Sequence, residues 1–151
     1  MAIQTKYLGE IEVQNEQKIE FSSGLPGFVD EIEFALIDFP GNPLFQILQS
    51  LSTPELAFIV TNPHQFYQDY EFKLDEQVQE SLHIKSEKDV LLRTIVTIKK
   101  PFQKSTLNLK APLIINPTAK KGKQYILNMD DYTTQAPIVQ SAPVAKGDQS
   151  C

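Results

Sequence analysis

The sequence contains few of the residues that metal sites and disulfides require. Its one cysteine is Cys151, the last residue, so it offers neither an internal disulfide nor a cysteine-rich metal site. There are only two histidines, His64 and His83, and neither has a cysteine neighbour or a second histidine at helical spacing. We therefore predict no metal site and no cofactor.

Catalytic and nucleotide-binding motifs are also missing. The GLPG turn at residues 24–27 lacks the GxxxxGK[ST] and GxGxxG patterns that place backbone amides on a phosphate. Ser22 and Ser23 stand outside any GxSxG nucleophile elbow. Asp130 and Asp131 are adjacent, so on a strand their carboxylates would point to opposite faces. We predict no catalytic residues and a protein that is not an enzyme.

Long apolar runs are absent as well. The runs at 57–60 and 95–98 are far shorter than the roughly 18 residues that a membrane span needs. The N-terminus has no basic stretch followed by a long apolar core, which a secretory signal would have. We expect a cytoplasmic protein with no membrane partner.

Charge is unevenly distributed along the chain. Residues 1–70 carry ten acidic and two basic side chains, whereas residues 71–151 carry nine acidic and twelve basic ones, so the halves differ as −8 and +3. A continuous acidic face would attract a basic partner and repel nucleic acid, although solubility alone is the alternative explanation. Lys120, Lys121 and Lys123 have no interleaved aromatics, so we expect no direct nucleic-acid binding.

Short β-type runs separated by proline, glycine and asparagine dominate the sequence, which has 151 residues, 41% of them hydrophobic, and ten prolines. The expected strands cover residues 6–13, 18–21, 33–39, 44–49, 56–60, 90–99, 106–110, 113–116 and 123–129. One short helix is expected over 76–82 behind Asp75, because Leu74, Val78 and Leu82 share one face. Residues 86–89 suggest a capping-box turn.

These elements predict a mostly β fold. Successive strands without long intervening helices favour antiparallel pairing, and at this length a small barrel hides most strand edges. We expect one antiparallel β-barrel-like domain over residues 1–132, with one or two short helices. Residues 133–151 have no aromatic and little to bury, and we expect them to be a disordered tail.

Aromatic and acidic side chains concentrate in residues 65–74, where four rings fall within seven positions. Aromatics with polar groups are enriched where proteins meet other proteins. We therefore place partner binding, by chemistry, on Phe66, Tyr67, Asp69, Tyr70 and Glu71. The alternative is that the rings close one end of the barrel. Gly24, Pro26 and Gly27 we assign to the shape of a backbone turn.

Several ordered segments resemble the FliW family. They are LGEIEV at 8–13, Phe21, GLPGF at 24–28, LAFIVTNP at 56–63, Asp69 with Tyr70, NLKAPLIIN at 108–116 and KGKQ at 121–124. Each is short, but together, at these spacings, they form a specific set that covers roughly residues 3–132. The tail extends beyond the resemblance.

The resemblance implies a flagellar assembly factor that works by binding proteins. It implies binding to flagellin in the cytoplasm and, when free, to the translational repressor CsrA, which relieves repression of flagellin mRNA translation. We expect overlapping sites for the two partners and a monomer in isolation. Three alternatives stay open: a flagellin-specific export chaperone only, a small-ligand-binding β-barrel, and a structural subunit of the flagellum.

Overall fold

The computed structural model describes residues 1–25 and 27–139. These residues form eleven strands, one α-helix and four 3-10 turns. The strands are β1 (Ala2–Thr5), β2 (Gly9–Glu12), β3 (Lys18–Glu20), β4 (Glu33–Asp38), β5 (Phe45–Ser50), β6 (Ala57–Thr61), β7 (Leu91–Thr97), β8 (Thr106–Leu107), β9 (Leu113–Asn116), β10 (Lys121–Gln124) and β11 (Ala136–Pro137). The helix is α1 (Glu76–Ser81), and the turns are η1 (Asn15–Gln17), η2 (Pro63–Gln65), η3 (Glu87–Asp89) and η4 (Phe102–Lys104).

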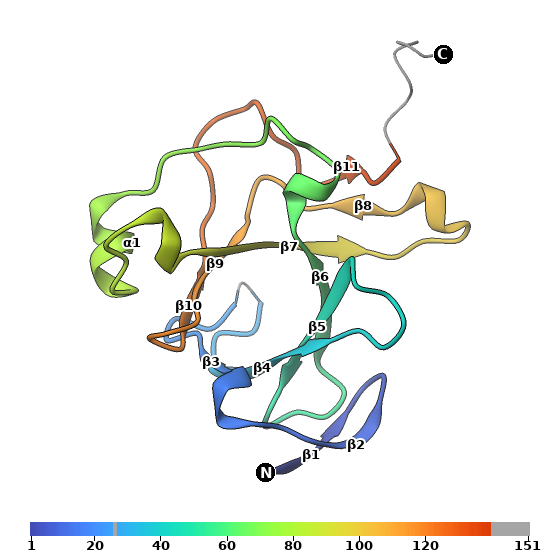
Figure 1. The fold of residues 1–151 in the computed structure, drawn as a ribbon. Helices are drawn as coiled ribbons and strands as arrows, with labels where there is room; N and C mark the ends of the chain where they lie inside the picture. The colour runs from blue at the N-terminus through green and yellow to red at the C-terminus, as the bar shows by residue number, and fades with distance from the viewer. Residues whose placement is uncertain (26, 140–151) are drawn as a thin grey trace.

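Seven strands close into a barrel, which confirms the predicted fold class. The sheet runs from β7 through β6, β5, β4, β3 and β10 to β9, and β9 pairs back onto β7 (Figure 1). Most neighbours are antiparallel, as expected, but β10 lies parallel to β3, with Lys121 opposite Glu20. Strand alternation in a sequence does not reveal such a long-range pairing, because it depends on how the barrel closes.

Strand β7 is shared by three neighbours. Its first residues pair with β9, its middle with β6 and its end with β8, where Val96 faces Leu107. Strand β8 then carries the short edge strand β11. The β1–β2 hairpin forms a separate two-stranded sheet beside the barrel (Figure 1).

The barrel buries side chains on both faces of its strands. Phe34, Leu48 and Val60 belong to one apolar cluster, whereas their chain neighbours Ala35, Ile47 and Ile59 belong to another. The cluster that contains Phe34, Leu48 and Val60 includes residues from strands all around the barrel, so it fills the barrel interior. The cluster that contains Ala35, Ile47 and Ile59 lies on the outer face of the barrel, where the β1–β2 hairpin, residues 66–72 and residues 127–138 cover it.

Local structure differs from the sequence prediction in three strands. The strand expected at 106–110 is reduced to the two residues of β8. The strand expected at 6–13 is a turn followed by β2, since Gly9 has a φ of +69° and reverses the chain. The strand expected at 123–129 lies earlier, at Lys121–Gln124, and residues 125–129 are not part of it. A side chain at Gly122 would come within 2.8 Å of the Phe21 ring, so close packing, not hydrophobicity, sets this strand.

The expected disordered tail does not begin at 133. Within residues 133–139, β11 pairs with β8, the Ile138 amide donates to the Ser105 carbonyl at 2.9 Å, and Ala136 and Ile138 are buried. Residues 140–151, the remainder of that expected tail, lie outside the described residues.

The helix forms close to where it was expected. Asp75 stands at the N-cap position, but its side chain makes no cap hydrogen bond, and Val78 provides the buried face. Ser86 and Asp89 form the capping box at η3. In the part of the chain that the structure describes, no helix is long and apolar enough to cross a membrane.

Candidate partner-binding surface

Residues 62–74 form a long excursion from the barrel between β6 and α1, and we call them the aromatic segment. It starts with a local cap, in which the Asn62 side chain accepts from the His64 amide at 3.0 Å and Pro63 fills the first position of η2. Proline suits that position because a backbone N–H there would have no partner within the turn, so nothing is lost by its absence. The chain is thereby directed away from the barrel before the aromatic residues begin.

Tyr70 anchors this segment to the core. Its side chain is only 2% exposed, and its hydroxyl donates to the Leu109 carbonyl at 2.6 Å. The Tyr132 ring meets it edge-on with 4.6 Å between centroids, and the His64 ring nitrogen Nε2 lies 2.8 Å from the Tyr70 carbonyl oxygen. Burial raises the pKa of the Tyr70 hydroxyl, so this donor stays protonated well into the alkaline range.

Phe66 and Tyr67 are half-buried and add two more attachments. The Phe66 ring stacks on Phe45 with 6.3 Å between centroids. The Tyr67 hydroxyl donates to the Pro137 carbonyl in β11, and burial raises its pKa as well. These rings therefore fix the segment against β5 at one point and β11 at another.

Asp69 and Glu71 are exposed on either side of buried Tyr70. The Glu71 backbone is held by Tyr132, whose hydroxyl lies 3.1 Å from both the amide nitrogen and the carbonyl oxygen of Glu71. The two ion pairs among the described residues involve other acids, Glu12 and Glu20. The aromatic segment thus presents two carboxylates on a backbone that is held in place.

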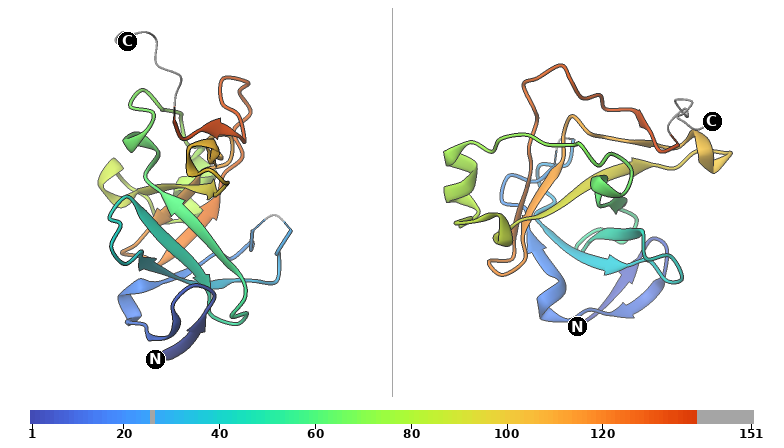
Figure 2. Two further views of the ribbon diagram at one scale, coloured as in Figure 1. Left: turned by 90° about the vertical axis from the view of Figure 1, so that its right-hand side faces the viewer. Right: turned by 45° about the horizontal axis from the view of Figure 1, so that its top comes forward.

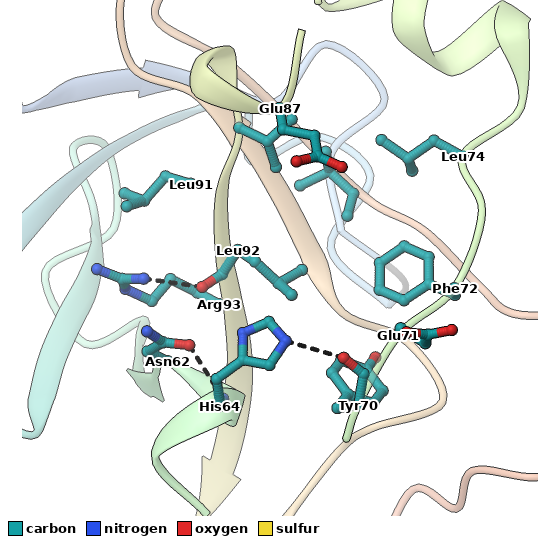
Figure 3. Close-up of a pocket in the computed structure, with 12 residues that line it drawn as sticks. Asn62, His64, Tyr70, Glu71, Phe72, Leu74, Glu87, Leu91, Leu92 and Arg93 are labelled. Carbon is teal, nitrogen blue, oxygen red and sulfur yellow. Dashed lines mark hydrogen bonds between the residues drawn. The ribbon is translucent and has the colours of Figure 1, made fainter. Parts of the chain in front are cut away.

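Two open hollows border the aromatic segment. One, of about 450 Å³, is lined by residues 65–70 and Tyr132. The other, of about 420 Å³, lies between the segment and β7, and Figure 3 shows Phe72 and Leu74 on the side of β7 toward which Leu92 points, while the Arg93 side chain extends to the other side. The guanidinium of Arg93 is already engaged, with Nε 2.7 Å from Gln46 Oε1 and Nη1 2.8 Å from the Leu92 carbonyl.

The structure places the five predicted partner-binding residues on one segment but gives them different roles. Asp69 and Glu71 are exposed, Phe66 and Tyr67 are half-buried, and Tyr70 is buried. Sequence reasoning did not find Tyr132 and Pro137, which hold the segment from the far end of the chain. No local signal marks them, because their partners are more than sixty positions away: the Tyr132 hydroxyl bonds to the Glu71 backbone, and the Pro137 carbonyl accepts from the Tyr67 hydroxyl.

The predicted glycine turn has the backbone that glycine permits. Gly24 and Gly27 have φ values of +65° and +86°. A side chain at Gly24 would come within 2.6 Å of the Val29 backbone, while one at Gly27 would meet nothing within 4 Å. Pro26, the third residue assigned to this turn, lies outside the described residues. Among the residues that are described, no group of three or more His, Cys, Asp or Glu could hold a metal ion.

Comparison with known proteins gives a consistent result. The model of the FliW protein family matches residues 2–138. The crystal structure of a flagellar assembly factor FliW superimposes with a TM-score of 0.88 at 38% identity, covering 93% of this chain and 99% of that one. Fold and sequence thus define the class, a barrel of the flagellar assembly factor type.

Curated relatives match over nearly their whole length. The flagellar assembly factor FliW of Oceanobacillus iheyensis is 47% identical over 148 residues, which is 98% of this chain and all of the relative. That of Bacillus subtilis is 44% identical over 138 residues, or 91% of this chain and 96% of the relative. This chain belongs to the FliW family of flagellar assembly factors.

Proposed function

We propose that this protein binds flagellin in the cytoplasm and, when free of it, binds and antagonises the translational repressor CsrA. Flagellin export would then release the protein to CsrA and raise flagellin synthesis. Family membership supports the flagellar role. The exposed pair Asp69 and Glu71, on an anchored backbone between two hollows, supports a protein contact at the aromatic segment.

Charge favours a basic RNA-binding protein as one partner. Residues 1–70, which include the exposed Asp69, carry a net charge of −8, and the exposed Glu71 follows directly after them. Such a surface speeds encounter with a basic protein and repels RNA phosphates held near it. Salt screens both effects, so CsrA binding should weaken as ionic strength rises.

The flagellin partner would use apolar contact instead. Terminal flagellin segments are expected to be amphipathic, and an amphipathic helix binds by laying its apolar face into a groove. The hollow between the aromatic segment and β7 offers Phe72, Leu74 and Leu92 for such a face. Because it borders Glu71, a flagellin segment there would crowd CsrA, and linkage makes that antagonism reciprocal.

A calorimetric titration into CsrA, repeated after saturation with flagellin, tests the partner switch. We expect binding in the first titration and its loss in the second. Binding that survives saturation would show separate sites and contradict the switch. Absence of CsrA binding in both titrations would leave an export chaperone for flagellin as the function.

A charge-reversal pair tests the location. Asp69→Lys with Glu71→Lys should weaken CsrA binding at least tenfold, because two attractive charges become repulsive. Glu16→Lys with Glu55→Lys is the matched control, since both acids are exposed and lie in the same acidic half. Equal losses in the two variants would mean that the overall field acts and that the aromatic segment is not the contact.

A further inference from the structure

The chain has one long stretch without acidic residues. Residues 90–129 contain no aspartate or glutamate but eight basic residues, whereas residues 1–89 contain sixteen acidic and five basic ones. The stretch is therefore +8 in a protein whose net charge is −5. Three of its lysines, Lys99, Lys100 and Lys104, fall in the short connection between β7 and β8.

That connection, residues 98–104, projects from the barrel, and we call it the hairpin tip. Figures 1 and 2 both show it extending beyond the rest of the barrel. Strands β7 and β8 form its stem, and at the base of the tip the Lys99 amide donates to Ser105 Oγ at 2.9 Å. Ser105 is fully buried, so the base of the tip is held by the core.

Apolar and basic side chains are exposed together on this tip. Ile98 is 51% exposed and Phe102 is 45% exposed, although the Phe102 ring also contacts Phe45 edge-on at 5.9 Å. Lys99, Lys100 and Lys104 are all exposed, and none of their ammonium groups forms an ion pair within the part of the chain that the structure describes. The tip is thus a projection with two exposed apolar side chains among three unpaired cations.

We propose that the hairpin tip docks reversibly on an anionic lipid surface. Lysines near an anionic leaflet are attracted to it, and aromatic and aliphatic side chains beside them enter the headgroup region. The tip projects from the barrel, and the hollows described above are lined by other residues, so a broad surface suits it better than a peptide that needs a groove. The acidic bulk of residues 1–89 would be repelled, which would orient the molecule tip-first.

Peripheral docking of the hairpin tip on a lipid surface differs from spanning a membrane, which the sequence argues against. The expectation of no membrane partner followed from the lack of a long apolar run and so concerned spanning segments. Peripheral docking needs only a few exposed groups and is weak and salt-dependent. It does not depend on whether the protein binds CsrA or flagellin.

Vesicle flotation tests the proposal. The full chain should float with vesicles that contain phosphatidylglycerol and remain unbound with pure phosphatidylcholine. Binding should be lost in roughly 0.5 M salt, because that concentration screens exposed charges beyond about 4 Å. No binding to phosphatidylglycerol vesicles would overturn the proposal. Binding to polyglutamate in place of vesicles would make the tip a contact for acidic proteins and would likewise overturn it.

Two triple variants with the same change in net charge locate the contact. Lys99→Gln, Lys100→Gln and Lys104→Gln together should weaken vesicle binding about 100-fold, since each lysine near the surface is worth roughly a factor of five. Lys120→Gln, Lys121→Gln and Lys123→Gln remove the same charge from the β9–β10 hairpin and should change binding less than about threefold. Equal losses would assign the effect to net charge and contradict docking by the tip.

The apolar part of the contact has its own test. Phe102→Ser should weaken vesicle binding by about tenfold while leaving the charge unchanged, because partly buried aromatic area is lost from the headgroup region. Tyr7→Ser is the control, since Tyr7 is 46% exposed on the β1–β2 turn. Full retention by Phe102→Ser would mean that only electrostatics acts and that the tip does not enter the lipid.

Discussion

Two irregular regions leave the barrel, and they are anchored by opposite chemistry. The loop at 22–32 is tied down by the Glu31 carboxylate, which accepts from the hydroxyls of Ser50, Ser52 at 3.1 Å and Thr53 at 2.8 Å. The aromatic segment is tied down by a neutral donor, the buried Tyr70 hydroxyl, 2.6 Å from the Leu109 carbonyl. The Glu31 anchor is stronger when its carboxylate is ionised, whereas the Tyr70 anchor donates only while its hydroxyl is protonated.

The two anchors should therefore fail at opposite ends of the pH scale. The hydroxyl of Ser50, followed by that of Thr53, lowers the pKa of Glu31 below its usual 4.5, so this stabilisation is present above pH 4.5 and is lost as pH falls below it. Burial raises the pKa of Tyr70, so its contribution is present below about pH 10 and is lost above it. Between these limits the surface that presents Asp69 and Glu71 should keep its shape.

The largest effect should come from removing the aromatic anchor. Tyr70→Ala leaves a cavity and an unpaired carbonyl, and we expect it to lower the free energy of unfolding by about 4 kcal/mol. Tyr70→Phe removes only the hydroxyl and should cost about 1–2 kcal/mol. Urea denaturation at pH 7 measures both. A cost below about 1 kcal/mol for Tyr70→Ala would mean that other contacts hold the segment.

The next largest effect concerns the loop at 22–32. Gly24→Ala combines a left-handed backbone with a clash against Val29, and we expect a loss of about 3 kcal/mol in unfolding free energy. Gly27→Ala has a similar backbone but open space, so about 1–2 kcal/mol is expected. Equal losses in the two variants would show that the clash is relieved by movement of the loop.

A smaller loss of stability is expected when the charge of the Glu31 anchor is removed. Glu31→Gln keeps the size of the side chain but removes its charge, and because Glu31 is partly exposed we expect a loss of about 1 kcal/mol at pH 7. The difference from the parent protein should shrink at pH 3, where the carboxylate itself becomes protonated. Thermal unfolding at both pH values gives the comparison. A difference that stays constant with pH would exclude an ionised anchor.

The smallest effect is expected at the edge of the aromatic segment. Tyr67→Phe removes the hydroxyl that donates to Pro137 and should cost about 0.5–1 kcal/mol. The loss should be local to β11, so the Ile138 amide, which donates to Ser105, should exchange its hydrogen faster. Faster exchange at the Phe34 amide in β4 as well would mean that the whole barrel, and not this edge, has been weakened.

Sequence reasoning succeeds where the signal is local. Short apolar runs between prolines and glycines place β4, β5, β6 and β7 within one or two residues, because strands buried on both faces have near-continuous apolar sequences. It fails for β11, since Ala136 and Ile138 are buried only when β8 is beside them. It also fails for the shift of β10, a largely polar strand that is fixed by contact with Phe21.

The same limit applies to the candidate site. Composition alone located the aromatic segment, because four rings and two acids in so few positions are unusual. It did not distinguish buried Tyr70 from exposed Asp69 and Glu71. That distinction depends on the Leu109 carbonyl and the Tyr132 ring, which lie far along the chain.

The parallel contact between β3 and β10 also affects how the chain is made. Lys121 and Glu20, which meet there, are 101 residues apart, so a ribosome adding about 5–20 residues per second needs roughly 5–20 seconds to supply the partner strand. During that time the outer edge of β3 is open to pairing with other nascent chains. Its exposed Glu20 gives that edge a charge, which discourages such pairing until β10 arrives.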